Sequence, residues 1–265
     1  MFFSTDSLAL TVAQAACVAL PGAGIGAWAD RLRTPFWALV LPLPIILIIA
    51  AVALVPSTAG VITWVALILV PLGGALALGW AAHGARPWLA VLAPALLALA
   101  WTHAGDRGGQ TAATLLIAGS AVTLGRLLAG AAPRQILKAG VVALAAVDAY
   151  LVFSNTLQAP NDALDAAVPA PGLPQLQSAS FGFAGLGYDD FFVAAVVGAL
   201  LATQPRRQLA AALALVAASL AWDQLFAFYD VLPATVPPAV VLLLCDTWRP
   251  AARRDTARAA WRRAA

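Results

Sequence analysis

The stretch FWALVLPLPIILIIAAVALV, residues 36–55, contains twenty residues and no charged side chain. A helix of that length covers about 30 Å, the hydrocarbon thickness of a bilayer. Other stretches of the same character lie on both sides of it. We therefore predict an all-α polytopic membrane protein with nine transmembrane helices, at about residues 8–28, 36–55, 60–82, 87–103, 111–130, 135–156, 179–204, 208–228 and 232–248.

The composition agrees with this fold class. Of 265 residues, 62% are hydrophobic and 10% charged, and the mean hydropathy is +0.88. Soluble domains are about 45–50% apolar and about 25% charged. This excludes a soluble enzyme, a nucleic-acid-binding protein and a disordered chain, and the long apolar runs argue against a transmembrane barrel. Nine spans would use roughly 180–200 residues, so we expect one transmembrane domain over residues 1–265.

The basic residues alternate with the predicted spans. Fourteen of the fifteen fall on one side of a nine-span arrangement, and only Arg107 falls on the other. The fourteen are Arg31, Arg33, Arg86, Arg126, Arg134, Lys138, Arg206, Arg207, Arg249, Arg253, Arg254, Arg258, Arg262 and Arg263. By the positive-inside rule, the amino terminus lies outside and the carboxyl terminus in the cytoplasm. The richness in Ala and Arg is typical of a GC-rich prokaryotic genome, so we expect the prokaryotic cell (inner) membrane.

The ends and the cysteines predict little beyond topology. The basic tail, residues 249–265, is expected to lie on anionic lipid headgroups, which attract each Arg by about 1 kcal/mol. Cys17 and Cys245 lie in apolar stretches and are interpreted as packing residues, and no metal site is suggested. Residues 157–178 are rich in Pro, Ala, Gln and Asp and predict an outside loop.

Acidic residues within the spans carry the functional information. A carboxylate at the bilayer centre costs several kcal/mol unless it is paired or hydrated. Asp148 lies inside predicted span six, and Asp189 and Asp190 lie in span seven after a Gly-rich approach. The Asp189–Asp190 pair is also explained as a helix cap, because Asp favours that position.

The depth of these acids in the membrane distinguishes a shared functional site from a simple helix cap. Asp148 is 14 residues from Arg134, Asp190 is 16 residues from Arg206, and Pro233 is 16 residues from the first Arg of the tail. At 1.5 Å per residue, all three lie roughly 21–24 Å from the cytoplasmic face. Two acids and a proline at one depth suggest a shared internal site.

Two neighbouring carboxylates suit acid–base catalysis of amide hydrolysis. They cannot both ionise, so they share one proton. The charged member can take a proton from an attacking water, and the neutral member can donate to the carbonyl oxygen and later assist the leaving nitrogen. This chemistry requires no metal and no cofactor.

These motifs resemble those of the presenilin and signal peptide peptidase family of intramembrane aspartyl proteases. That family has nine spans, an acid in span six, a Gly-x-Gly-Asp motif in span seven and Pro-Ala-Leu at the start of span nine. Here VDAYLVF at residues 147–153 looks like the first motif. GYDD at 187–190, followed by FF at 191–192 and GALL at 198–201, looks like the second, and LPAT at 232–235 looks like the third.

The resemblance implies roles for individual residues. Asp148 and Asp190 would be the catalytic acids, and Gly187, Pro233, Ala234 and Thr235 would hold the unwound substrate. Three positions depart from the family pattern: Val147 replaces a Tyr, Asp189 replaces the second Gly, and Thr235 replaces a Leu. The catalytic acid of span seven is Asp189 if Tyr188 is an insertion, and Asp190 if the first Gly stays in register.

The resemblance also implies the substrates. They would be transmembrane helices or signal-peptide remnants with their amino termini in the cytoplasm, as for signal peptide peptidase. Two alternatives remain open. One is a protease similar to the prepilin peptidases, which also use two acids but eight spans. The other is a small proton- or cation-coupled transporter in which Asp148, Asp190 and Asp223 form an ion path.

Overall fold

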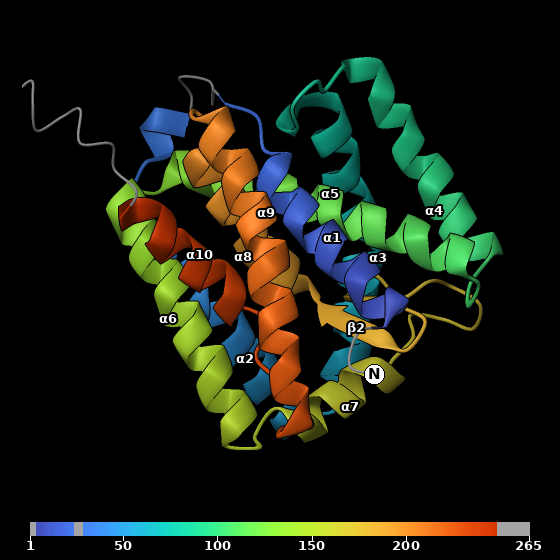
Figure 1. Cartoon of the computed structure of the whole chain (residues 1–265). Helices are drawn as coiled ribbons and strands as arrows, with labels where there is room; N and C mark the ends of the chain where they lie inside the picture. The colour runs from blue at the N-terminus through green and yellow to red at the C-terminus, as the bar shows by residue number, and fades with distance from the viewer. Residues whose placement is uncertain (1–3, 24–28, 248–265) are drawn as a thin grey trace, which may run out of the picture.

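The computed structural model describes residues 4–23 and 29–247, and this part of the chain is predominantly helical. The helices and strands are α1 (Thr5–Ala19), η1 (Ala29–Leu32), η2 (Pro35–Val40), α2 (Pro42–Leu54), α3 (Thr58–Leu76), η3 (Ala77–Ala81), η4 (Pro87–Val91), α4 (Leu92–Thr102), α5 (Arg107–Ala131), α6 (Arg134–Phe153), α7 (Gln158–Ala166), β1 (Ser178–Phe181), β2 (Ala184–Gly187), α8 (Tyr188–Leu201), α9 (Pro205–Trp222), η5 (Asp223–Ala227) and α10 (Val236–Thr247). Figure 1 shows their arrangement.

Each predicted apolar segment overlaps one of the longer helices. Among the described residues, four helices are long and apolar enough to cross a membrane: Thr58–Ala81, Arg107–Ala131, Arg134–Phe153 and Pro205–Ala227. Shorter apolar helices occupy Thr5–Ala19, Pro42–Leu54, Pro87–Thr102 and Val236–Cys245. The count of nine membrane spans therefore stays a prediction. The basic tail, residues 249–265, lies outside the described residues.

The prediction of a helix from residue 179 is wrong at its start. Residues 178–187 form an antiparallel hairpin in which Phe181 pairs with Ala184, and the helix begins only at Tyr188. The turn needs Gly182, whose φ of +59° lies in the left-handed region that favours glycine. The hairpin thus delivers the chain directly into the first turn of α8.

Two further boundaries differ from the prediction. The expected loop at 157–178 contains the short helix α7, whose ends lie at Gln158 and Ala166. Span nine was expected from residue 232, but α10 begins at Val236, after a non-helical segment. Pro237 and Pro238 fall in its first turn, where a missing N–H leaves no helical bond unmade.

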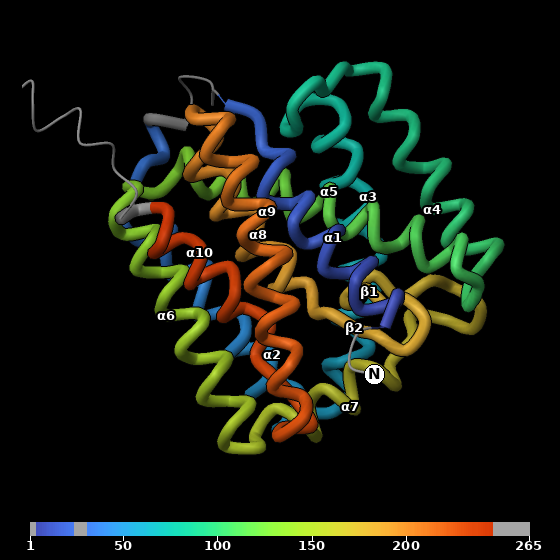
Figure 2. The backbone as a smooth tube through the Cα atoms, in the orientation of Figure 1, coloured from blue at the N-terminus to red at the C-terminus, as the bar shows by residue number. Residues whose placement is uncertain are grey.

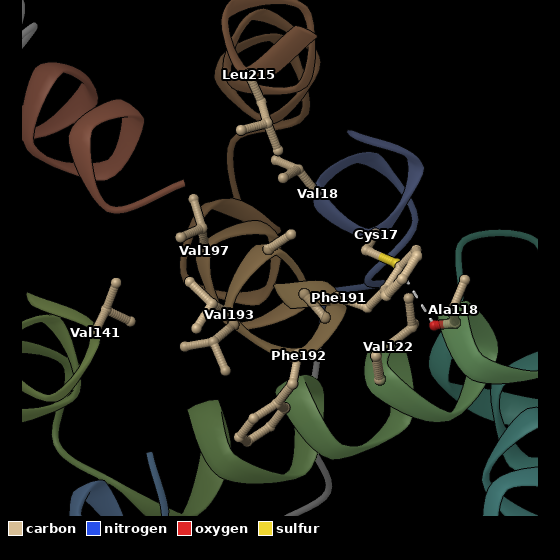
Figure 3. Packing of buried hydrophobic residues seen from close by; sticks show 14 of the residues in the cluster. Cys17, Val18, Ala118, Val122, Val141, Phe191, Phe192, Val193, Val197 and Leu215 are labelled. Atoms are coloured by element: carbon tan, nitrogen blue, oxygen red, sulfur yellow. Dashed lines mark hydrogen bonds between the residues drawn. The ribbon is translucent and has the colours of Figure 1, made fainter. Parts of the chain in front are cut away.

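Helix α8 occupies the centre of the molecule. It packs against α1, α5, α6, α9 and α10, and Figure 3 shows Phe191 pointing toward Cys17 and Val122 while Phe192 points to another side. Buried residues occupy all sides of the helix from Asp190 to Leu201. A helix that is apolar all round is stable only in such surroundings. The smooth tube of Figure 2 shows the same enclosure by α1, α9 and α10.

Small residues allow α8 to approach its neighbours closely. A Cβ at Gly198 would meet the backbone of Val18 in α1, and a Cβ at Gly125 of α5 would meet the backbone of Ala195. Such small-residue crossings are typical of helices that associate in lipid, where packing rather than the hydrophobic effect drives association. These contacts fix the position of α8 along its axis relative to α1 and α5.

Hydrogen bonds gather the loops into two groups. In the first group, the N–H of His83 donates to the carbonyl oxygen of Leu20, and the Nε2 of Gln208 donates to that of Pro21. The N–H of Thr34 donates to the carbonyl oxygen of Ala131. In the second group, Gly182 N–H donates to Gln110 Oε1, and Ser7 donates to Asp223 Oδ2. The loops within each group were predicted to share one side of the membrane.

Candidate functional site

Asp148 lies on α6 and is 5% exposed. Its Oδ2 accepts a hydrogen bond of 2.6 Å from Thr235 Oγ1 and a longer one of 3.4 Å from Thr235 N–H. Thr235 is fully buried and directly precedes α10. The structure therefore brings the predicted acid of span six into direct contact with the predicted Pro-Ala segment, although 87 residues separate them in the chain.

Asp190 is the third residue of α8 and is 7% exposed. Its Oδ2 accepts a 2.8 Å hydrogen bond from the N–H of Gly187, the residue that precedes the helix. An acid at this position of a helix commonly reaches back to the capping residue. Neither aspartate occupies the capping position itself, because the capping residue is Gly187, but the bond from Asp190 back to Gly187 fixes the rotamer of a buried acid.

Asp189 lies next to this pair. It adjoins Asp190 in the first turn of α8. Asp148 is connected to this turn by hydrogen bonds, because Gln14 Nε2 donates to the carbonyl oxygens of Asp190 and Ala234, and the next residue, Thr235, donates to Asp148. A Cβ at Gly187 would run into the Asp189 carboxylate. The carboxylate of Asp189 therefore approaches Gly187 closely, and the choice between Asp189 and Asp190 as the reacting acid stays open.

The segment before α10 has irregular backbone in a buried position. Residues 231–233 have no regular structure and residues 234–235 form a turn. Leu232, Pro233 and Thr235 are all buried, and Ala234 is partly buried. Non-helical backbone at membrane depth is tolerated where protein buries it or where it lines a cavity. This segment thus supplies main-chain polar groups beside Asp148.

The hairpin that precedes α8 is held at its turn. Phe183 N–H donates to Asp6 Oδ2 over 3.4 Å, and Gly182 N–H donates to Gln110 over 3.0 Å. Asp6 is also paired with Arg107 at 3.5 Å. Contacts from α1 and α5 therefore restrain the hairpin that leads to Asp190.

Polar residues outside this site form separate interactions. Asp223 accepts a 2.9 Å hydrogen bond from Ser7, His83 interacts with Gln208, and His103 with Thr102. The two cysteines, Cys17 and Cys245, are free and buried. Within residues 4–23 and 29–247, no group of three or more His, Cys, Asp or Glu side chains could hold a metal ion.

Sequence reasoning missed one residue of this site, Gln14 of α1. Its side chain is 3% exposed, and its Nε2 donates to the carbonyl oxygens of Asp190 and Ala234. Gln14 and Thr11 are the polar residues of an otherwise apolar run over residues 8–20, three positions apart. A buried amide in such a run was the available signal, because amides in lipid need a partner.

Comparisons with known proteins give no family. No family model, no curated protein and no solved structure matches the chain.

Proposed function

We propose that the protein is an intramembrane aspartyl protease that hydrolyses peptide bonds of transmembrane helices or signal-peptide remnants. The observation that carries the proposal is the buried hydrogen bond between Asp148 and Thr235, which Gln14 links to the first turn of α8 with Asp189 and Asp190. The site thus combines an acid in one apolar helix, an acid pair in a neighbouring helix and a segment of irregular backbone.

The chemistry follows from the proximity of the carboxylates. Asp148 and Asp190 share one proton, because two negative charges held close together are unfavourable. The ionised member removes a proton from a water molecule as that water attacks the amide carbon. The protonated member gives its proton to the carbonyl oxygen, which forms a tetrahedral gem-diol. As the gem-diol collapses, the acid that took the proton from water passes it to the leaving nitrogen, and the other acid recovers its proton from a hydroxyl of the gem-diol. The hydrogen bonds from Thr235 and Gly187 hold the two side chains in fixed rotamers for these steps.

The irregular segment accounts for how a helical substrate is attacked. A helix protects its amides by internal hydrogen bonds, so it must unwind before water can reach a carbonyl. Thr235 contacts Asp148, and the non-helical backbone of residues 231–235 offers hydrogen-bonding groups to an unwound strand. Gly187 lies at the same site next to the acid pair.

The topology in this proposal has nine spans, with the amino terminus outside and the carboxyl terminus in the cytoplasm of a prokaryotic cell. The two groups of hydrogen-bonded loops support this arrangement, because the loops that carry the basic residues are bonded to one another. The large exposed side chains of α3, such as Ile68, Leu69 and Leu72, suit contact with lipid.

The test is cleavage of a radiolabelled transmembrane peptide by the purified protein in detergent. Asp148→Asn and Asp190→Asn should each abolish cleavage, and an aspartic-protease transition-state analogue should inhibit the unaltered protein. Asp223→Asn is the matched control, since Asp223 is bonded to Ser7 and should leave cleavage unchanged.

Asp189 is tested in the same assay. Asp189→Gly should retain cleavage if Asp190 is the reacting acid, and abolished cleavage in that variant would assign the role to Asp189. Cleavage that survives Asp148→Asn would overturn the proposal. Proton-coupled ion uptake into proteoliposomes, without cleavage, would favour the transporter alternative instead.

A further inference from the structure

Gln14 connects the two halves of the candidate site. From α1 its Nε2 donates to the carbonyl oxygen of Asp190 at 3.2 Å and to that of Ala234 at 3.4 Å. An amide nitrogen carries two hydrogens, so one Gln can satisfy both acceptors. The two carbonyls belong to residues 44 positions apart in the chain, one in α8 and one just before α10.

The sequence explains why the carbonyl of Ala234 accepts from a side chain of another helix. In a continuous helix it would accept from the N–H of residue 238, but that residue is Pro238 and has no N–H. The first regular bond of α10 instead runs from Ala239 N–H to Thr235. Because Pro238 offers this carbonyl no N–H, the amide of Gln14 supplies a donor from outside the helix.

The bonds form a continuous path between the acids. The path runs from Asp190 through its carbonyl to Gln14, then to Ala234, and from the adjacent Thr235 to the carboxylate of Asp148. We propose that Gln14 is a positioning residue, which sets the spacing between Asp190 and the Asp148–Thr235 pair. This inference rests on the proposed protease function, and Gln14 itself is not expected to touch the substrate.

A second buried glutamine provides a matched control. Gln208 of α9 is 2% exposed, and its Nε2 donates to the carbonyl of Pro21 at 2.9 Å, in the group of loops that holds the basic residues. Gln14→Leu and Gln208→Leu remove the same amide from equally buried positions and leave side chains of similar size. Only the first interrupts the path between the acids.

The experiment measures cleavage kinetics and backbone hydrogen–deuterium exchange in the full-length protein. For Gln14→Leu we expect kcat to fall about 10- to 100-fold, because misplacement of reacting groups by about 1 Å has effects of that size. KM should stay within about twofold, and exchange in residues 229–240 should rise. Gln208→Leu should leave both readouts as in the unaltered protein.

Gln14→Glu adds a signature that a purely structural role would not give. A carboxylate cannot donate a hydrogen bond, whereas a protonated carboxyl donates one. The activity of this variant relative to the unaltered protein should therefore recover as the pH is lowered.

The outcomes separate this inference from the proposed function. If Asp148→Asn abolishes cleavage but Gln14→Leu cleaves normally, the function stands and the role of Gln14 is overturned. Equal losses of kcat in Gln14→Leu and Gln208→Leu would also overturn it. If the unaltered protein cleaves nothing, the proposed function fails, and hydrogen–deuterium exchange in residues 229–240 then tests the role of Gln14. A rise in exchange confined to Gln14→Leu supports the link between α8 and the segment before α10, and unchanged exchange rejects it.

Discussion

Replacing Thr235 by Val isolates the hydrogen bond on which the site depends. The hydroxyl of Thr235 donates to Asp148 over 2.6 Å in a fully buried position. Valine has nearly the same shape, so the substitution removes the donor without leaving a cavity. The longer bond from the main-chain N–H of residue 235 remains available.

The magnitude follows from the charge of the acceptor. A hydrogen bond to a charged group contributes about 1.5–3 kcal/mol, and a bond between neutral groups about 1 kcal/mol. If the bond holds the ionised acid in the transition state, Thr235→Val should lower kcat about 10- to 150-fold. Thr235→Ser keeps the hydroxyl and should retain most of the activity.

The assay combines peptide cleavage with unfolding measured in mixed micelles. Thr123→Val is the control, because Thr123 is also buried and its hydroxyl donates to the carbonyl of Gly73 at 2.7 Å. That control should lower the free energy of unfolding by about 1 kcal/mol and leave cleavage within twofold. The reasoning is refuted if Thr235→Val cleaves as fast as the unaltered protein, or if Thr123→Val loses as much activity.

Three further predictions concern neighbouring features. Gly187→Ala displaces the carboxylate of Asp189 while the protein stays folded by circular dichroism, so it should lower cleavage about tenfold or more if Asp189 is the reacting acid and leave it within about twofold if Asp190 reacts; a result that disagrees with that of Asp189→Gly would contradict this reasoning. Arg107→Gln should change the free energy of unfolding by less than about 1 kcal/mol, since the Arg107 side chain is 73% exposed, and a larger change that persists in high salt would contradict this. Burial first, and then the charge of Asp162, raise the pKa of Asp165 in α7. The folded state therefore favours the protonated acid, so α7 is more stable below that pKa and less stable above it. Amide exchange in α7, corrected for intrinsic rates, should be slower at acidic pH than at pH 7. Faster exchange at acidic pH would reject the direction of this pKa shift.

The helical part of the fold was accessible from the sequence because apolar runs of sufficient length are readable without tertiary information. The run at 36–55 predicts a helix, and α2 lies within it. Counting residues along each span also predicted that Asp148 and Pro233 lie at one depth, and Thr235, two residues after Pro233, donates to Asp148. Neither argument depends on which helices pack together.

The hairpin before α8 was not predicted, and the reason is local. The stretch SASFGFAGLG at 178–187 is apolar enough to be counted with the span that follows, and its alternation is too short to be distinguished from a helix. Its strand structure depends on Gly182 in the left-handed region and on Asp6 from a remote helix. Such a restraint cannot be read from the strand residues themselves.

Gln14 was missed for the opposite reason. Its role arises from an absent N–H at Pro238, more than two hundred residues away, and only the folded chain brings the amide to the orphaned carbonyl. The sequence contains both residues but no pattern that links them. Polar residues in an apolar run therefore identify candidates for such roles, and packing decides which candidate acts.

The most direct test of the central claim is an experimental structure of the protein with a hydroxyl-bearing transition-state analogue of aspartic proteases. The account predicts that the analogue's hydroxyl lies within hydrogen-bonding distance of both the Asp148 and the Asp190 carboxylates, with Thr235 still bonded to Asp148. A structure in which these carboxylates point to different faces, or in which the analogue contacts neither of them, would contradict the account.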